Sequence, residues 1–290
     1  MSTLTKLKTA VVTRLVSPLV ARLPASVLND VMSRGSVKRK TVRRALGRGA
    51  LAEAYIKGEG IEVGAFNSPL PVPEGVKVRY VDIAPAEGLE GHAQEFRGEG
   101  HGLEIVTPDI VDDAQTLATV ADGSQDFVIA CHIIEHTEDP IGAFGNWLRV
   151  LKPGGILFVA IPDKRFTFDV ERDATPFEHL LRDHEEGPAR SRQEHYEEVA
   201  RLVMGVRDEH RVREFAEQNQ EHVGHTHFHV WTQADMFEMI AALRKRAGLE
   251  FDVLASAAGG NETIFVLRKG DAGSDRTLAD ESLRSAREQL

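Results

Sequence analysis

The alternation of short apolar strands with helices, which begins at Gly60, constrains the fold of this chain more than any other feature. The segments GIEVGA (60–65), VRYVDI (78–83) and ILFVAIP (156–162) are rich in β-branched residues and end at turn-forming residues or an acid, as strands do. Between them, QDFVIACHIIEH (125–136) is a nearly unbroken apolar run, which is typical of a strand buried on both faces. The pattern predicts a doubly wound α/β sheet.

The helices and the end of the chain complete this pattern. The segment 139–155 predicts an amphipathic helix with Pro140 in its first turn and Gly154-Gly155 at its end. The segment 232–249 predicts a helix that Thr232 caps and Gly248 ends, and 249–269 predicts a hairpin that turns at 258–261. The sheet pattern stops after Pro162 for roughly 65 residues, which predicts an insertion with its own helices.

Charge divides the chain unevenly. The net charge is −10, yet residues 1–48 hold about eleven Lys and Arg and one acid, Asp30. We therefore divide the chain into a basic helical N-terminal arm (1–57), a main domain (58–270) whose insertion 163–229 would form a substrate lid, and a polar tail (271–290). Two hypotheses account for residues 1–48: peripheral contact with an anionic membrane, or packing of the arm on the core or on a second copy in a homodimer.

Other classes of protein and of location are disfavoured. The acidic body argues against a nucleic-acid surface, so no nucleic-acid partner is expected. The lone Cys131 allows no disulfide framework, and no signal peptide or membrane-length apolar run is present. These observations predict a cytoplasmic protein, peripheral to the inner face of the membrane if the arm binds lipid.

A nucleoside crevice is predicted where the first two strands end. Asp82 closes the second strand and is placed to accept the two hydroxyls of a ribose. The loop after Gly64 lacks the G-x-G-x-x-G of pyrophosphate sites, so a cofactor without a pyrophosphate is favoured. The prolines at 69, 71 and 73 argue against a helix between the two strands.

In order and spacing, these motifs resemble the class I S-adenosylmethionine-dependent methyltransferases (methyltransferase type 11-like) over roughly residues 58–163 and 232–269. The matching pieces are EVGA, YVDI, IVDDAQTL and the block SQDFVIACHIIEHTEDPIGAFGNWLRVLKPGGILFVAIP. The resemblance implies a Rossmann-like seven-stranded sheet with a C-terminal antiparallel hairpin, a helical N-terminal arm and a helical insertion after the fifth strand. It also implies S-adenosyl-L-methionine as cofactor, with contacts at Glu62, Gly64, Ala65, Asp82, Ile83, Asp113, Ala114 and His132.

Histidines are the candidate general bases, because an alcohol acceptor is only weakly acidic. The candidates, in falling order, are His227, His136 and His229, and Asp163 could orient one of them. His136 could instead order the strand end together with Glu135. In an extended HVGHTHFHVWT, His225, His227 and His229 would share one face. They could hold a divalent metal or form a hydrogen-bonded substrate wall; no H-E-x-x-H motif is present, and a metal is not favoured.

The acceptor is inferred from resemblance alone. EVGAFNSPLPVP, DKRFTFD and HFHVWT look like segments of bacterial methyltransferases found among polysaccharide-assembly enzymes. This predicts O-methylation of a hydroxyl on a saccharide or glycan intermediate, with a small-molecule or oligosaccharide acceptor as partner. The alternatives are methylation of a lipid, quinone or other small metabolite, and a non-catalytic nucleoside-binding or interaction module.

Overall fold

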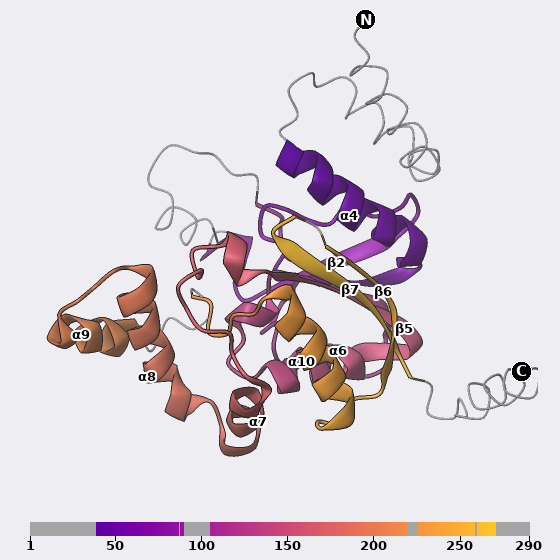
Figure 1. The fold of residues 1–290 in the computed structure, drawn as a ribbon. Helices are drawn as coiled ribbons and strands as arrows, with labels where there is room; N and C mark the ends of the chain where they lie inside the picture. The colour runs from indigo at the N-terminus through magenta and orange to yellow at the C-terminus, as the bar shows by residue number, and fades with distance from the viewer. Residues whose placement is uncertain (1–38, 87, 90–104, 220–225, 259, 271–290) are drawn as a thin grey trace, which may run out of the picture.

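The fold is built on one seven-stranded sheet (Figure 1). The computed structural model describes residues 39–86, 88–89, 105–219, 226–258 and 260–270. The strand order is β3-β2-β1-β4-β5-β7-β6, with β7 alone antiparallel to both of its neighbours. The bounds are β1 Glu59–Val63, β2 Lys77–Asp82, β3 Ile110–Val111, β4 Gln125–Cys131, β5 Leu151–Pro162, β6 Phe251–Ala258 and β7 Glu262–Lys269. The predicted α/β sheet with a C-terminal hairpin is confirmed.

Helices cover both faces of the sheet (Figure 1). Helix α4 (Arg39–Tyr55) lies on one face, while α6 (Pro140–Val150) and α10 (Gln233–Lys245) lie on the other. The alternation along β4 explains this arrangement, because successive side chains point to opposite faces of a sheet. Phe127 and Ile129 pack with Ala52 and Ile56 of α4, whereas Val128 packs in the larger core that holds α6 and α10.

Of three predictions about local structure, two are confirmed and one is wrong. Thr232 and Asp235 form a reciprocal capping box at the start of α10. No helix forms between β1 and β2. Helix α6, however, ends at Val150, and Gly154-Gly155 lie within β5 rather than at the helix end. A Cβ on Gly155 would come within 3.1 Å of the Asp126 carbonyl oxygen, so this glycine permits close strand contact.

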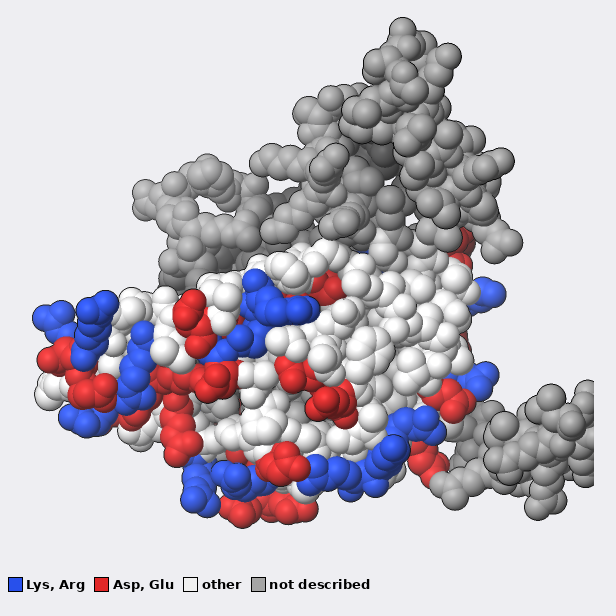
Figure 2. Space-filling model, in the orientation of Figure 1, with Lys and Arg blue, Asp and Glu red and all other residues white. Residues whose placement is uncertain are grey.

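The chain after β5 forms further helices, as predicted. They are η2 (Lys164–Phe166), α7 (Phe177–Glu186), α8 (Ala189–Glu198), a π-helical turn (Val199–Val203) and α9 (Glu209–Asn219). Helices α8 and α9 extend away from the sheet (Figure 1). Figure 2 shows Lys and Arg interspersed with Asp and Glu over this extension. Three ion pairs there involve α8 or the turn after it, at Arg190–Glu186, Arg201–Glu197 and Arg201–Glu209.

The described part of the basic arm packs on the sheet. Helix α4 continues through Gly47 and Gly49 to Tyr55. Arg48, which is 6% exposed, donates to both carboxylate oxygens of Glu262 at 2.8 and 2.5 Å. Residues 1–38, on which the membrane and homodimer hypotheses mainly rest, lie outside the described residues, as do His225 and the tail 271–290. No described helix combines the length and apolarity that a membrane span requires.

Candidate functional site

A cavity of about 410 Å³ opens at the carboxyl ends of β1, β2 and β4. Its volume lies within the range of small-molecule sites. Five of the predicted cofactor residues line it together, and the other lining residues come from the loop after β3 and from the end of β4. The lining residues are Gly64, Asp82, Ile83, Asp113, Ala114, Gln115, Ile133, His136, Thr137 and Glu138.

Gly64 shapes the wall of this cavity. Its φ of +61° is a conformation that L side chains rarely adopt. A Cβ at this position would lie 2.1 Å from Cδ1 of Ile133, which lines the same cavity. The glycine therefore keeps open a cradle at the end of β1. Asp82 lies at the neighbouring strand end, where the hydroxyls of a ribose would need an acceptor.

The remaining three predicted cofactor residues, Glu62, Ala65 and His132, do not line the cavity. The Glu62 carboxylate is buried and accepts from the Leu70 amide at 2.9 and 3.1 Å. His132, with a φ of +60°, places Nε2 2.7 Å from the carboxylate of Glu262. Cofactor contacts at these three positions stay predictions.

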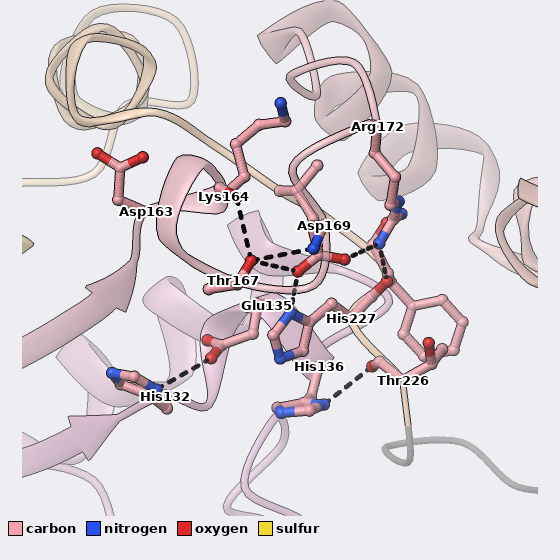
Figure 3. A network of polar contacts seen from close by, with 12 residues as sticks. His132, Glu135, His136, Asp163, Lys164, Thr167, Asp169, Arg172, Thr226 and His227 are labelled. Carbon is pink, nitrogen blue, oxygen red and sulfur yellow. Dashed lines mark hydrogen bonds and ion pairs between the residues drawn. The ribbon is translucent and has the colours of Figure 1, made fainter. Parts of the chain in front are cut away.

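Two predicted histidines meet beside the cavity. His136 follows β4 in the short helix η1 (Ile134–His136), and His227 lies in the segment that precedes α10. Their ring centroids are 4.8 Å apart in an edge arrangement (Figure 3). Nδ1 of His136 lies 2.9 Å from the Thr226 carbonyl oxygen, and burial lowers the pKa of His136. His227 is thus held next to a residue that lines the cavity.

Asp169 orients His227, a role that the sequence suggested for Asp163. The Asp169 carboxylate lies 2.6 Å from Nδ1 of His227 and also accepts from Arg172 at 2.9 Å (Figure 3). Arg172 donates further to the carbonyl oxygens of His227 and Phe228 at 2.7 and 3.0 Å. Asp163 instead binds Arg165 through both carboxylate oxygens. The suggestion for Asp163 is therefore wrong.

The extended backbone that would place the histidines of HVGHTHFHVWT on one face is not found at the two described ones, His227 and His229. The segment 226–230 is not a strand, and His229 joins a different cluster, in which its Nε2 lies 3.6 Å from Asp183. Sequence reasoning missed Asp169 and Arg172 beside His227, and it missed His179, Asp183 and His195 beside His229. The spacing of His179 and Asp183 by four residues indicates that these two side chains meet if the stretch is helical, and it is the one signal that the sequence offers for this cluster.

The groups beside the cavity could act on a proton or hold a cation. Glu135, His136 and His227 bring ligand atoms to within 4.8 Å of one another. Both carboxylate oxygens of Glu135 are buried without a hydrogen-bond partner in the described part of the chain. The backbone carbonyl of Glu135 accepts from the Phe228 amide at 2.7 Å, which fastens the segment before α10 to the end of β4.

Comparison with known proteins identifies the domain. Residues 60–159, which hold most of β1 and β5 and all of β2, β3, β4 and α6, match a family model described as a methyltransferase domain. A comparison with curated proteins finds no match. The match therefore comes from the part of the chain that forms the cavity, at the position where the sequence motifs predicted a cofactor.

Solved structures with a similar fold include several methyltransferases. One from Methanosarcina mazei is 18% identical, with 75% of this chain and 94% of that one covered and a TM-score of 0.38. One from Aquifex aeolicus is 15% identical, with 80% and 93% covered and a TM-score of 0.42. A possible histamine N-methyltransferase from Thermotoga maritima is 18% identical, with 73% and 82% covered and a TM-score of 0.37.

These TM-scores lie below 0.5, so the functional assignment does not depend on the solved structures. It depends on the family model and on the sheet. The chain contains an S-adenosylmethionine-dependent methyltransferase domain, to which residues 60–159 belong.

Proposed function

We propose that this methyltransferase O-methylates a hydroxyl group of a saccharide or glycan intermediate, with His227 as the general base and Asp169 as its positioning residue. One observation supports the proposal above the others: His227 lies beside the cofactor cavity with its ring nitrogen held 2.6 Å from a buried carboxylate. An alcohol acceptor needs a base at neutral pH, and a histidine held in this way is suited to the task.

The hydrogen bond between His227 and Asp169 determines which ring nitrogen of His227 can accept a proton from the acceptor. An ionised carboxylate only accepts hydrogen bonds, so Nδ1 of His227 must carry the proton that it shares with Asp169. The lone pair therefore resides on Nε2, the nitrogen that can accept a proton. Arg172 keeps the Asp169 carboxylate in place through an ion pair at 2.9 Å. A second ion pair, to Glu198 at 2.7 Å, holds Arg172 itself.

His136 supports the same site in a second way. Its Nδ1 faces a carbonyl oxygen, which only accepts, so Nδ1 is also the protonated nitrogen here. Nε2 of His136 is consequently an acceptor too, on a residue that lines the cavity. The two imidazoles could share the task of orienting a hydroxyl group, with His227 taking its proton.

The reaction needs little more from the protein than alignment and one proton transfer. The bound cofactor supplies an electrophilic methyl group on a sulfonium. With cofactor and acceptor bound, this methyl group would pass to the acceptor oxygen, and the electron pair of the carbon–sulfur bond would stay on sulfur. Nε2 of His227 receives the hydroxyl proton, so charge and atoms balance. Holding the acceptor beside the cavity and excluding water supplies the rest of the acceleration.

The surface beside His227 offers aromatic faces to an acceptor. Phe168 is 57% exposed, and its ring centroid lies 4.7 Å from that of His227. Phe166 is 58% exposed two residues earlier. Aromatic faces next to hydrogen-bonding side chains suit sugar rings, which present both apolar C–H faces and hydroxyl groups. The likeness of DKRFTFD and HFHVWT to enzymes of polysaccharide assembly supports the same acceptor class.

The same exposed side chains favour a second candidate, an apolar acceptor such as a lipid or quinone. Phe166, Phe168 and Val170 are each at least half exposed, and such a group of apolar side chains can bind an apolar molecule. The two candidates differ in the cell fraction that receives the methyl group, because polysaccharides and lipids separate on extraction with organic solvent.

Methyl transfer to a fractionated extract tests the proposal. The full chain is incubated with S-adenosylmethionine that carries a labelled methyl group, and we expect label in the aqueous glycan fraction. His227→Gln should then lower kcat on that fraction by about 100- to 10,000-fold, the usual contribution of a general base. His210→Gln, at an exposed position of α9, is the matched control and should not change kcat.

Label in the lipid fraction would overturn the saccharide assignment in favour of the second candidate. Full activity of His227→Gln would overturn the role of this histidine. Cofactor binding by the variants is measured alongside, and it should stay close to that of the wild type, because His227 does not line the cavity.

A further inference from the structure

A second group of titratable side chains lies outside the cofactor cavity and is not used in methyl transfer. It consists of His179 and Asp183 on α7, His195 on α8, and His229 in the segment before α10. His179 and Asp183 are four residues apart on one helix and thus share a face. The four side chains bring one ligand atom each to within 4.8 Å of the others.

The distances within this group fit a tetrahedral metal site. Nε2 of His179 lies 3.0 Å from Oδ2 of Asp183 and 3.1 Å from Nε2 of His195. Nε2 of His229 lies 3.6 Å from Oδ2 of Asp183. Metal–ligand distances of about 2.0–2.1 Å in a tetrahedron place neighbouring ligand atoms about 3.3–3.4 Å apart. The three observed separations bracket this value.

Two of the atoms lack the hydrogen bonds that burial normally requires. Oδ2 of Asp183 and Nε2 of His229 are buried, and neither has a hydrogen bond of normal geometry in the described part of the chain, although Oδ2 lies 3.0 Å from Nε2 of His179. His229 is 0% and Asp183 3% exposed. A buried polar atom without a partner costs about 1–3 kcal/mol, so two of them that face a common centre indicate a missing partner.

Neighbouring groups fix the orientation of these ligands. Nδ1 of His229 lies 3.0 Å from the Thr137 carbonyl oxygen, which requires a proton on Nδ1 and leaves the lone pair on Nε2. The Ser191 hydroxyl donates to Oδ1 of Asp183 at 2.8 Å and leaves Oδ2 for the centre of the cluster. Contacts of this kind from carbonyl and hydroxyl groups are characteristic of metal sites in proteins.

The charge of the cluster also suits a cation. The imidazoles of His195 and His229 are buried, which favours the neutral form, and the neutral imidazole is the form that binds metal. Arg172 is the cation that acts on His195 from nearby. The charge of Arg172 is balanced by its ion pairs to Asp169 and Glu198 at 2.9 and 2.7 Å. The carboxylate within the cluster itself is that of Asp183.

We infer that His179, Asp183, His195 and His229 form a structural site for a divalent transition metal, with Zn²⁺ preferred. Three imidazole nitrogens and one carboxylate oxygen, from three buried residues and the partly buried His179, are a donor set that Zn²⁺ accepts readily. The four ligands come from three separate segments, so the metal would hold α7 and α8 to the segment before α10. That segment also contains His227, two residues from His229.

Metal analysis of the tag-free full chain tests this inference without reference to methyl transfer. We expect about one Zn²⁺ per chain after expression with zinc and exhaustive dialysis, from a site with four protein ligands. His195→Gln and Asp183→Asn should each lose the metal. Ser191→Ala should weaken Zn²⁺ binding by about 10- to 100-fold in competition with a chromophoric chelator, as is usual for a residue that orients a ligand. His210→Gln is the control and should retain the wild-type content.

Cobalt substitution keeps the test valid if the ligand variants fail to fold. Co²⁺ added to metal-free wild-type protein should give the intense visible absorption of a tetrahedral site, and Zn²⁺ should abolish it. A wild-type chain that binds neither ion would overturn the inference. Metal that remains in the double variant His179→Gln/His195→Gln would overturn it as well, because it would place the ion elsewhere, such as at Glu135, His136 and His227.

Discussion

Glu62 should make the stability of this protein fall as pH rises through neutrality. The side chain is 1% exposed on β1, and its carboxyl group accepts from the Leu70 amide at 2.9 and 3.1 Å. Burial raises the pKa of Glu62 from 4.5 to about 7, although the Leu70 amide and the charge of Arg48 act in the opposite direction. The folded protein therefore keeps this carboxyl protonated at pH values where the unfolded chain does not.

The sign and the size of the effect follow from proton linkage. A raised pKa in the folded state stabilises the fold fully below the unfolded value of 4.5, and this contribution is lost as pH rises through about 7. A difference of about 2.5 between the two pKa values is equivalent to about 3 kcal/mol of unfolding free energy. Other groups titrate in the same range, so the wild type alone does not isolate this contribution.

Glu62→Gln isolates it, because the amide is close in shape to the acid and does not titrate. We expect the unfolding free energy of the wild type, measured by urea denaturation, to fall by about 3 kcal/mol relative to Glu62→Gln between about pH 4.5 and pH 8. Parallel pH profiles for the two proteins would refute the reasoning, since they would show that Glu62 has the same pKa in the folded and unfolded chains.

Two further predictions concern the walls of the cofactor cavity and the basic arm. Gly64→Ala should weaken S-adenosylmethionine binding in calorimetry, because its Cβ would lie 2.1 Å from Ile133 and φ at this position is +61°; unchanged affinity would contradict the proposed cradle. Arg48→Met should lower the unfolding free energy by about 3 kcal/mol, the lower end of the range for a broken buried pair, because the carboxylate of Glu262 keeps only His132 as a partner. A loss below about 1 kcal/mol, the size expected for a surface pair, would show that α4 is not fastened to β7 in this way.

The sheet could be predicted from the sequence because its determinants are local. The apolar run of β4, the cap at Thr232 and the prolines after Gly64 each act within a few residues, and each has the expected result in the structure. Glycine positions were less informative. Gly47 and Gly49 lie within α4, where packing on the sheet outweighs the weak helix propensity of glycine.

The site was only partly predictable, since its contacts join segments far apart in the chain. Gly64 and Asp82 could be placed together because parallel strands end at one edge of a sheet. The sequence does not pair Asp169 with His227, 58 residues away, and favours Asp163 instead because this residue directly follows a strand. Likewise, an expected extended backbone grouped His227 with His229, whereas the irregular segment directs them to separate clusters.

Calorimetric titration of the full chain with S-adenosylmethionine tests the central claim, that the cavity at the ends of β1 and β2 binds the cofactor. We expect the wild type to bind one equivalent and Asp82→Ala to bind about 10- to 150-fold more weakly, because a hydrogen bond to a charged group contributes about 1.5–3 kcal/mol. Asp252→Ala, at an exposed position on β6, is the control and should bind as the wild type does. No binding by the wild type, or equal affinity in Asp82→Ala, would contradict the claim.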